Sequence, residues 1–211
     1  MTTPREPPDG PEPARPSGAP GAGGHSDRGA LLRAAGEQFA EMGYVDASLA
    51  RILVRAGRAT GAPEIPPLGK RELAEWVMDE AIDRKLGGFS SAVASAPDPL
   101  TAVISGVAAV VELSVRDPVV RGGNRLLDDP SISGEHAVRN YQLGERALDE
   151  GLAAAVAQGL LRSDLDHREL ARSLTTSVVG HRLICHRTNT LDDLPARVSR
   201  MWQAMLPLIR A

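Results

Sequence analysis

The 211-residue chain is poor in several chemically informative residue types. Its single cysteine excludes a disulfide framework and a four-cysteine zinc site. Aromatic residues make up only 3% of the chain, and of its 24 basic residues only Lys70 and Lys85 are lysines. The net charge of −3 is not typical of a generally basic nucleic-acid binder, although residues 26–72 carry a small positive excess.

Long apolar segments and targeting signals are also scarce. The longest nearly apolar run, Leu100 to Val115, is short for a bilayer span and contains several polar side chains. No basic-then-apolar leader opens the chain, so a secretory signal is not expected. We therefore expect a cytoplasmic protein that has no membrane partner.

Motifs of common enzymes are missing as well. The chain has no Gly-x-Ser-x-Gly elbow, phosphate-binding loop or His-Glu-x-x-His motif. Enzymatic activity stays open, because Glu112, Tyr141 and His181 would support acid–base chemistry if they converged in a pocket. His181 and Cys185 are four residues apart and share a helix face, but two ligands without a third favour a packed pair over a metal site. We expect neither a metal nor a cofactor.

Proline and glycine are abundant, with 16 and 21 residues respectively. Residues 1–26 hold seven of the prolines and five of the glycines, and almost no large apolar side chain. Such a segment buries too little surface to offset the entropy lost on ordering. We predict a disordered tail, with an interaction arm as the alternative.

From residue 27 onward the apolar residues recur at helical spacing, and no stretch alternates with period two. The sequence predicts an all-α protein. Its domains are a helix-turn-helix-type domain over 27–72 and a helical bundle over 73–211. The expected helices cover 27–43, 47–56, 70–89, 99–116, 119–127, 134–158, 167–187 and 191–210.

One stretch, RGALLRAAGEQFAEMGYVDASLARILVRAGRATGA, carries a specific family likeness. It resembles the opening of the TetR family of transcriptional regulators, which have an amphipathic helix ending in Phe-x-x-x-Gly-Tyr and an Ile-x-x-x-Ala-Gly turn before the recognition helix. The residues at matching places are Phe39, Gly43, Tyr44, Ser48, Ile52, Ala56 and Gly57, followed by Lys70 and Leu73 of the fourth helix.

The C-terminal part narrows the resemblance. The segments DPVVRGGNRLLDDPS and VVGHRLICHRTNTLDDLPARVSRMWQAMLPLIRA look like those of the γ-butyrolactone receptor branch. The resemblance implies a homodimer through the last two helices, a small apolar or lactone-like ligand in the bundle, and a double-stranded DNA operator. Receptors of this branch place a Trp over the lactone, and by spacing that place falls near Gly144, one turn after Tyr141.

The recognition segment departs from the family pattern. Where the family has a capping Thr, a phosphate-binding Tyr and a buried Phe, this chain has Ala59, Glu64 and Pro67. Pro63 fits a first helical turn if Thr60 is the cap, but Pro66 and Pro67 do not continue a helix, because each lacks an N–H and disfavours helical geometry in the residue before it. We expect a truncated or absent reading helix, with a short turn that still docks in DNA as the alternative.

Two sets of side chains are candidate contacts. The DNA-binding candidates are Arg51, Arg55, Arg58, Thr60 and Lys70, although scattered basic residues are also common on any solvated face. The ligand-binding candidates are Glu112, Asn124, Arg125, Tyr141 and His181, which are polar residues on otherwise apolar helices. For Glu112 the alternative is an exposed face. For Asn124 and Arg125 the alternative is an interhelical contact.

Two functional hypotheses follow. The first is a small-molecule-responsive regulator of the TetR type. The second is a TetR-fold protein that has lost operator binding and uses its bundle pocket to bind or chemically transform a small molecule.

Overall fold

The computed structural model describes residues 22–57 and 69–211, and the side chains from Arg28 onward within them. Residues 1–21 and 58–68 are outside this description. The tail predicted for residues 1–26 therefore lies almost wholly outside the described residues, and the altered recognition segment lies wholly outside them.

The described residues form eight α-helices and one short 3-10 helix. The only strand-like pairing among them is an isolated antiparallel bridge between Leu161 and Arg210. The all-α prediction is confirmed. The elements in chain order are α1 (Ala22–Asp46), α2 (Leu49–Arg55), α3 (Lys70–Ala94), α4 (Pro99–Arg116), α5 (Pro118–Leu127), α6 (Gly134–Ala157), α7 (His167–Arg187), η1 (Leu191–Asp193) and α8 (Leu194–Ile209).

Helix boundaries follow the local sequence signals in most places. α4 and α7 have the predicted bounds, because Asp98 and Asp166 cap their first turns by accepting backbone N–H bonds. Gly43 interrupts α1 and Gly57 follows α2, each with a φ of +74°, a conformation that favours glycine. Other bounds differ from those expected: α1 begins earlier, α3 ends later, and α8 begins at Leu194 after the short 3-10 helix.

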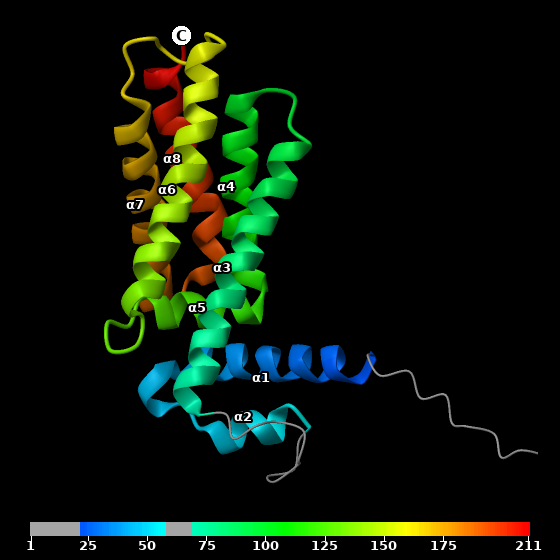
Figure 1. Cartoon of the computed structure of the whole chain (residues 1–211). Helices are drawn as coiled ribbons and strands as arrows, with labels where there is room; N and C mark the ends of the chain where they lie inside the picture. The colour runs from blue at the N-terminus through cyan, green and yellow to red at the C-terminus, as the bar shows by residue number, and fades with distance from the viewer. Residues whose placement is uncertain (1–21, 58–68) are drawn as a thin grey trace, which may run out of the picture.

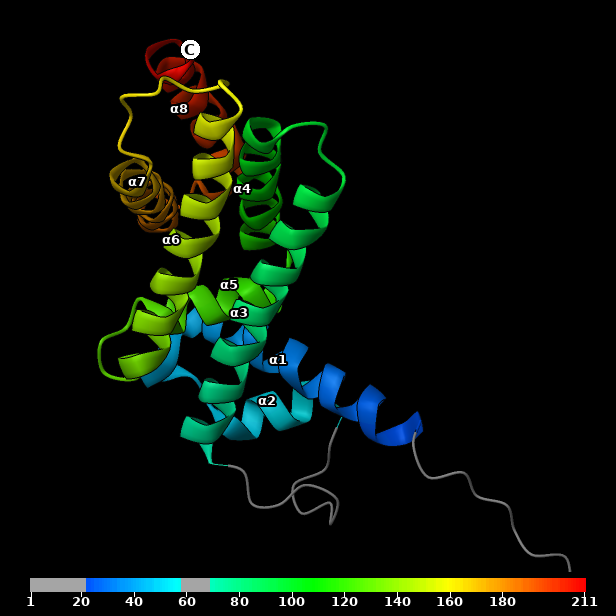
Figure 2. The same ribbon diagram turned by 45° about the horizontal axis from the view of Figure 1, so that its top comes forward.

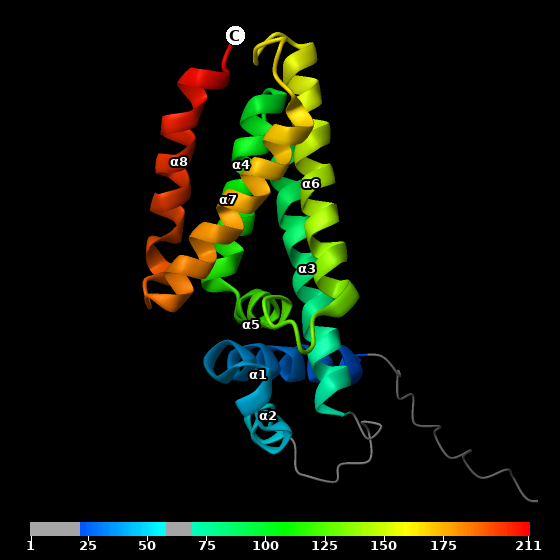
Figure 3. The ribbon, with the colours of Figure 1, turned by 90° about the vertical axis from the view of Figure 1, so that its left-hand side faces the viewer.

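The helices are arranged in two parts joined by α3 (Figure 1). α1 lies across the base of the bundle and α2 lies below α1, and turning the molecule keeps this order (Figure 2). α3 rises from the level of α2 into the bundle. α5 lies crosswise at the base, between α1 and the long helices (Figure 3). We call α1, α2 and the described chain between them the head.

Each part has its own hydrophobic core. The head core joins α1, α2, α5 and the first half of α3, with Phe39, Ile52 and Leu73 fully buried. The bundle core joins α4, α6, α7 and α8, with Leu152 and Leu174 fully buried. Each such side chain contributes about 1.5–3 kcal/mol by leaving water. The domain boundary predicted after residue 72 stays a prediction, and α3 runs through both cores.

α4 is the one helix among the described residues that is long and apolar enough, by length and composition, to cross a membrane. It packs against α3, α5, α6 and α8. That packing is typical of the core helix of a folded bundle, so this helix is weak support for a membrane span.

The head and α5 are packed backbone to backbone. A Cβ placed on Gly122 would lie 2.4 Å from the carbonyl oxygen of Gly36, and a Cβ on Gly36 would lie 2.5 Å from the carbonyl oxygen of Pro118. Only a residue without a side chain fits at either place. α5 is therefore in direct contact with the middle of α1.

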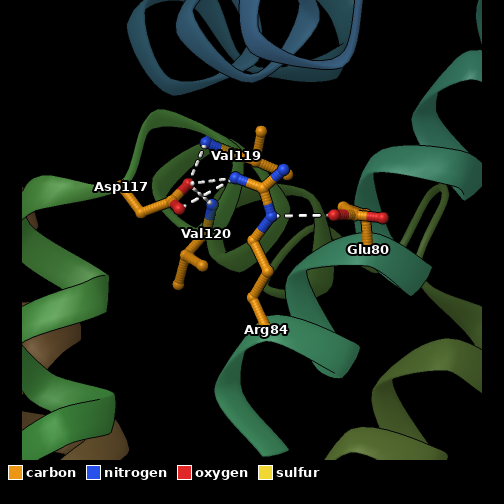
Figure 4. Close-up of polar contacts among 5 residues, drawn as sticks. All are labelled: Glu80, Arg84, Asp117, Val119 and Val120. Atoms are coloured by element: carbon orange, nitrogen blue, oxygen red, sulfur yellow. Dashed lines mark hydrogen bonds and ion pairs between the residues drawn. The ribbon is translucent and has the colours of Figure 1, made fainter. Parts of the chain in front are cut away.

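Asp117 organises the junction between α4 and α5 (Figure 4). Its Oδ1 accepts the backbone N–H groups of Val119 at 2.8 Å and Val120 at 3.1 Å, which caps α5. Arg84 of α3 donates to both carboxylate oxygens, at 2.8 and 3.1 Å, and also donates to Glu80 at 2.8 Å. One carboxylate thus ties three helices together at the base of the bundle.

We expect Asp117→Ala to lower the free energy of unfolding by about 1–2 kcal/mol, as the sum of a lost cap and a partly exposed ion pair. Asp117→Asn retains the capping oxygen and should recover about half of that loss. Urea unfolding of the two variants beside the wild type measures both values. Equal losses in the two variants would contradict the capping role.

Candidate functional site

The described DNA-binding candidates all lie in or beside the head, but their surroundings differ. Arg51 is exposed on α2. Arg55 pairs with Glu41 at 3.4 Å and with Glu37 at 3.5 Å, so its charge is shared with two acids of α1. Arg58 and Thr60 lie outside the described residues, as do Ala59, Pro63, Glu64, Pro66 and Pro67.

Lys70 begins α3 and is held against the end of α1. Its Nζ donates to the carbonyl oxygen of Val45 at 2.9 Å and lies 4.9 Å from the centre of the Tyr44 ring. A cation over an aromatic face is favourable, and the two contacts join the start of α3 to the end of α1. Of the three described candidates, Arg51 is the one whose position leaves it most available to phosphate.

A cavity of about 130 Å³ lies inside the bundle between α3, α4, α5, α6 and α7. Most of its wall is apolar, with Phe89, Val107 and Leu148 among the lining side chains. A small set of polar side chains converges on it, as in typical small-molecule sites. The polar lining consists of Lys85, Ser114, Asn124, Asn140, Tyr141, Thr175 and Arg182.

Two of the five predicted ligand-binding residues line this cavity, namely Asn124 and Tyr141. Gly144 also lines it, one turn after Tyr141, and a Cβ at Gly144 would meet no atom within 4 Å. The space beside Gly144 is therefore open, and the correspondence of this position with the Trp of the receptor branch stays a prediction.

The other three predicted ligand-binding residues lie outside the cavity, which corrects the expectation that they gather there. Glu112 pairs with Arg116 at 2.8 Å on a partly exposed face. His181 lies on the α7–α8 surface, and the Nδ1 atom of its ring is buried without a hydrogen-bond partner in the described structure. Because Glu112, Tyr141 and His181 do not converge, the acid–base trio considered from the sequence does not form.

Arg125 acts between helices instead of in the cavity. Its Nη1 donates to the carbonyl oxygens of Ala40 at 2.9 Å and Glu41 at 3.2 Å, near the end of the first part of α1. The interhelical alternative considered for this residue describes the contact. Arg125 thus adds a polar link between α5 and the head beside the glycine contact.

Lys85 is the main residue of the site that the sequence analysis missed. As a whole the residue is only partly buried, but its ammonium group lies inside the bundle. Its Nζ donates to Asn140 Oδ1 at 2.6 Å and Asn124 Oδ1 at 3.1 Å. A signal was available, because Lys85 falls three residues after Ile82 and four before Phe89, on the apolar face of α3.

The pKa of Lys85 is lowered from 10.5 to about 7, mainly by burial and in smaller part by the nearby charge of Arg182, while Asp128 opposes the shift. Desolvation disfavours the charged form of an amine, so the direction follows from the surroundings.

The lowered pKa makes stability depend on pH. Above about pH 7 the folded protein has lost this proton while the unfolded chain keeps it up to about pH 10.5, so stability rises with pH through that window. Between pH 6 and pH 9 we expect Lys85 to contribute about 2–3 kcal/mol of added stability. Lys85→Met should remove this slope, which urea unfolding at several pH values measures. A variant with the wild-type slope would contradict the assignment.

Arg182 and Asp128 form a close ion pair beside the same cavity. Nη1 of Arg182 lies 2.6 Å from Oδ2 of Asp128 and Nη2 lies 2.7 Å from Oδ1, and the side chains are only 12% and 16% exposed. A second, smaller pocket shares Ser114, Asn124 and Arg182 with the main cavity. The polar end of the cavity therefore continues toward the tip of α5.

Potential metal ligands are not clustered in the described part of the chain. No group of three or more His, Cys, Asp or Glu side chains there is placed to hold a metal ion. Cys185 is a free, fully buried thiol that belongs to the bundle core.

Residues 98–210 match the profile of the family described as "Tetracyclin repressor-like, C-terminal domain". That match spans more than half of the chain. The chain belongs to this TetR-like family. No curated protein matches the chain in sequence.

Three solved structures are similar in fold to this TetR-family chain over most of its length. One, described as "Molecular basis for control of antibiotic production by a bacterial hormones", is 27% identical with a TM-score of 0.78, covering 87% of this chain and 97% of that chain. A γ-butyrolactone receptor (ArpA-like protein) is 23% identical with a TM-score of 0.74, covering 88% and 89%. CprB from Streptomyces coelicolor, bound to its biological operator sequence, is 23% identical with a TM-score of 0.70, covering 86% and 87%.

These matches confirm the resemblance stated from the sequence. The described residues of this TetR-family chain have the two-part arrangement, and γ-butyrolactone receptors are among the proteins with a similar fold. Membership of this family favours the first hypothesis over a pocket-based activity without DNA binding.

Proposed function

We propose that this TetR-family protein is a cytoplasmic, homodimeric transcription regulator whose DNA binding responds to a small molecule in the bundle cavity. The observation that carries the proposal is the position of α5. One short helix lines the cavity through Asn124 and contacts the head through Gly122 and Arg125.

This position gives a route from ligand to DNA. A ligand at the polar end of the cavity displaces or tightens the contacts of Asn124, and α5 shifts against its neighbours. The backbones of α5 and α1 are in direct contact at Gly122 and Gly36. A shift of α5 therefore moves α1 and with it the head. The ligand controls DNA binding to the extent that it prefers one of the two head positions.

The dimer is proposed to form through α7 and α8. Their shared surface has a shallow apolar groove that includes Met201, Met205 and Leu208, and Ile184 on α7 is also exposed. Leu208 and Ile184 are 68% and 51% exposed, which is high for large apolar side chains. A two-fold axis through this surface would present two heads to two half-sites of a palindrome.

The DNA contacts are proposed to come from Arg51 on α2 and from the segment over 58–68. Arg51 would hold a phosphate, which fixes register and carries no sequence information. Glu64, Pro66 and Pro67 replace family residues in the neighbouring segment, so this head would read DNA with fewer contacts than the family pattern supplies.

The ligand is proposed to be small and largely apolar, as for a lactone, with one polar end. The open space at Gly144 replaces the Trp of the receptor branch. The cavity would therefore accept a ligand of different shape from a simple γ-butyrolactone.

A mobility-shift assay with duplex fragments flanking the protein's own gene tests the proposal. We expect a specific shift by the dimer, and Arg51→Ala should weaken it about three- to tenfold and flatten the salt dependence by about one unit of slope. Arg162→Ala is the matched control and should leave the shift unchanged, because Arg162 pairs with Asp164 and contacts the backbone at the end of α8. No shift at low salt by a folded dimer would overturn the proposal.

A further inference from the structure

The polar end of the cavity has more positive than negative charge. The charged and titratable groups that line the cavity and its smaller neighbour around Lys85 are Arg182 and His186 on α7, Tyr141 on α6, Arg121 and Arg125 on α5, and Asp128 at the end of α5. Of these, Asp128 is the one carboxylate, and it is already paired with both terminal nitrogens of Arg182. No carboxylate in the described structure lies within ion-pair distance of Lys85.

The partners that Lys85 does have are neutral. Asn124 and Asn140 each offer an amide oxygen, which accepts a hydrogen bond but does not compensate a charge. An ammonium group in a largely apolar cavity is unfavourable without an opposite charge. The protonated form of Lys85 therefore has no compensating charge in the described structure, and a ligand that supplies one would favour that form.

We propose that the cavity binds a small amphiphilic carboxylate, whose short acyl chain or ring lies among the apolar side chains and whose carboxylate pairs with Lys85. This inference deepens the proposed function, on which it rests, by naming the chemical class of the ligand. A neutral lactone would accept a hydrogen bond from Lys85 but would leave its charge uncompensated.

A second observation supports an oxygen-rich group at this place. Thr175 lines the same cavity from α7, and its hydroxyl oxygen is buried without a hydrogen-bond partner in the described structure. Buried hydroxyl groups normally have a partner. A ligand carboxylate has two oxygens with several lone pairs, so it has acceptors for more than one donor of this cavity.

The size of the cavity limits the rest of the ligand. A dry cavity of about 150 Å³ in another protein is large enough for benzene. The present volume of about 130 Å³ is therefore suited to a single ring or a short chain. The apolar wall, which includes Phe89 and Val107, favours a hydrocarbon portion without further polar groups.

The same contact explains how such a ligand would act on the head. Lys85 donates to Asn124, and Asn124 Nδ2 in turn donates to Ser114 Oγ at 3.2 Å. A carboxylate that draws the ammonium group toward itself weakens the hydrogen bond from Lys85 to Asn124. The position of α5 against its neighbouring helices then changes. The ion pair would thus form at Lys85, whose hydrogen bond to Asn124 connects the cavity to α5.

Calorimetry with matched probes tests the inference on DNA-free protein. Octanoate and octanamide have the same chain and differ in charge, and γ-octalactone is the neutral lactone of the same length. We expect octanoate to bind one site per chain at least about tenfold more tightly than either neutral probe. At about pH 8, where free Lys85 is mostly neutral, octanoate binding should take up close to one proton, measured by repeating the titration in buffers of different ionisation enthalpy.

Two variants separate Lys85 from general charge. Lys85→Met should lose about tenfold or more of the octanoate affinity and all of the proton uptake, while octanamide binding changes less than about twofold. Arg146→Met removes an exposed positive charge from α6 and is the matched control, with wild-type binding expected. Thermal unfolding by circular dichroism checks that both variants are folded.

Nuclear magnetic resonance on the wild type gives a test that needs no variant. Since Lys70 and Lys85 are the only lysines, isotope-labelled lysine gives two side-chain signals that can be followed through a pH titration. Octanoate should raise the titration midpoint of one signal by about two pH units and leave the other in place.

Each other outcome overturns the inference: equal binding of octanoate and a neutral probe, full octanoate affinity in Lys85→Met, no binding of octanoate by folded wild-type protein, or unmoved lysine signals. None of them bears on the mobility shift, which uses no ligand. If the mobility-shift assay showed no binding, the proposed regulator function would be overturned, but the proposed ligand site would not be affected.

Discussion

Replacing Gly122 with valine is expected to lower the free energy of unfolding by about 3 kcal/mol, at the upper end of what overpacking costs. The reason is the contact of α5 with α1, where a Cβ on Gly122 would lie 2.4 Å from the carbonyl oxygen of Gly36 and 2.7 Å from its Cα. The obstructing atoms are backbone atoms, which cannot rotate away as a flexible side chain does. Relief requires the two helices to separate.

The separation should be visible as well as costly. Hydrogen exchange of the backbone in α1 should accelerate in Gly122→Val more than exchange in α6, because α1 loses its contact with α5 while the packing of the bundle core is unchanged. Gly87→Val is the matched control. Gly87 is also in a helix and is exposed, and a Cβ there would meet nothing within 4 Å, so urea unfolding should change by no more than about 0.5 kcal/mol. A Gly122→Val variant as stable as this control would refute the tight contact.

The second large effect is expected from Asp128. Asp128→Ala leaves the guanidinium of Arg182 without its carboxylate, in a place where the two side chains are only 16% and 12% exposed and Lys85 is the next charge. Removing one partner of a buried ion pair costs about 3–5 kcal/mol, and the residual exposure places this pair near 3 kcal/mol. Urea unfolding above and below neutral pH measures the loss.

A double-mutant cycle isolates the pair itself. Arg182→Met should also destabilise the protein, but Asp128→Ala combined with Arg182→Met should lose less than the sum of the single losses, by about 1–3 kcal/mol. Simple additivity would mean that the two side chains do not depend on each other. Arg172→Met, an exposed residue of α7, is the control and should be close to neutral.

Local sequence features predict most of the helices. α4 and α7 match their expected bounds because an aspartate cap precedes each of them and a continuous apolar face follows. Gly43 and Gly57 end or interrupt helices for the same local reason. Such signals depend on a few neighbouring residues, and a single sequence displays them fully.

The site depended on contacts that the sequence does not display. Lys85 meets Asn124 and Asn140 only because α3, α5 and α6 converge, so its place in the fold was not visible from α3 alone. Arg125 was assigned to the ligand because it is a polar residue on an apolar helix, but it meets the backbone of Ala40 instead. A polar residue on an apolar face indicates a partner, and the packing of distant helices decides which one.

The central claim is that occupation of the cavity and DNA binding by the head are coupled through α5. Fluorescence anisotropy tests it directly, with the shifted DNA fragment as the labelled duplex and with octanoate or γ-octalactone added at a concentration that calorimetry shows to saturate the cavity. We expect the bound probe to weaken DNA affinity about five- to 150-fold, the usual range of allosteric coupling. A probe that fills the cavity and leaves DNA affinity unchanged would contradict it.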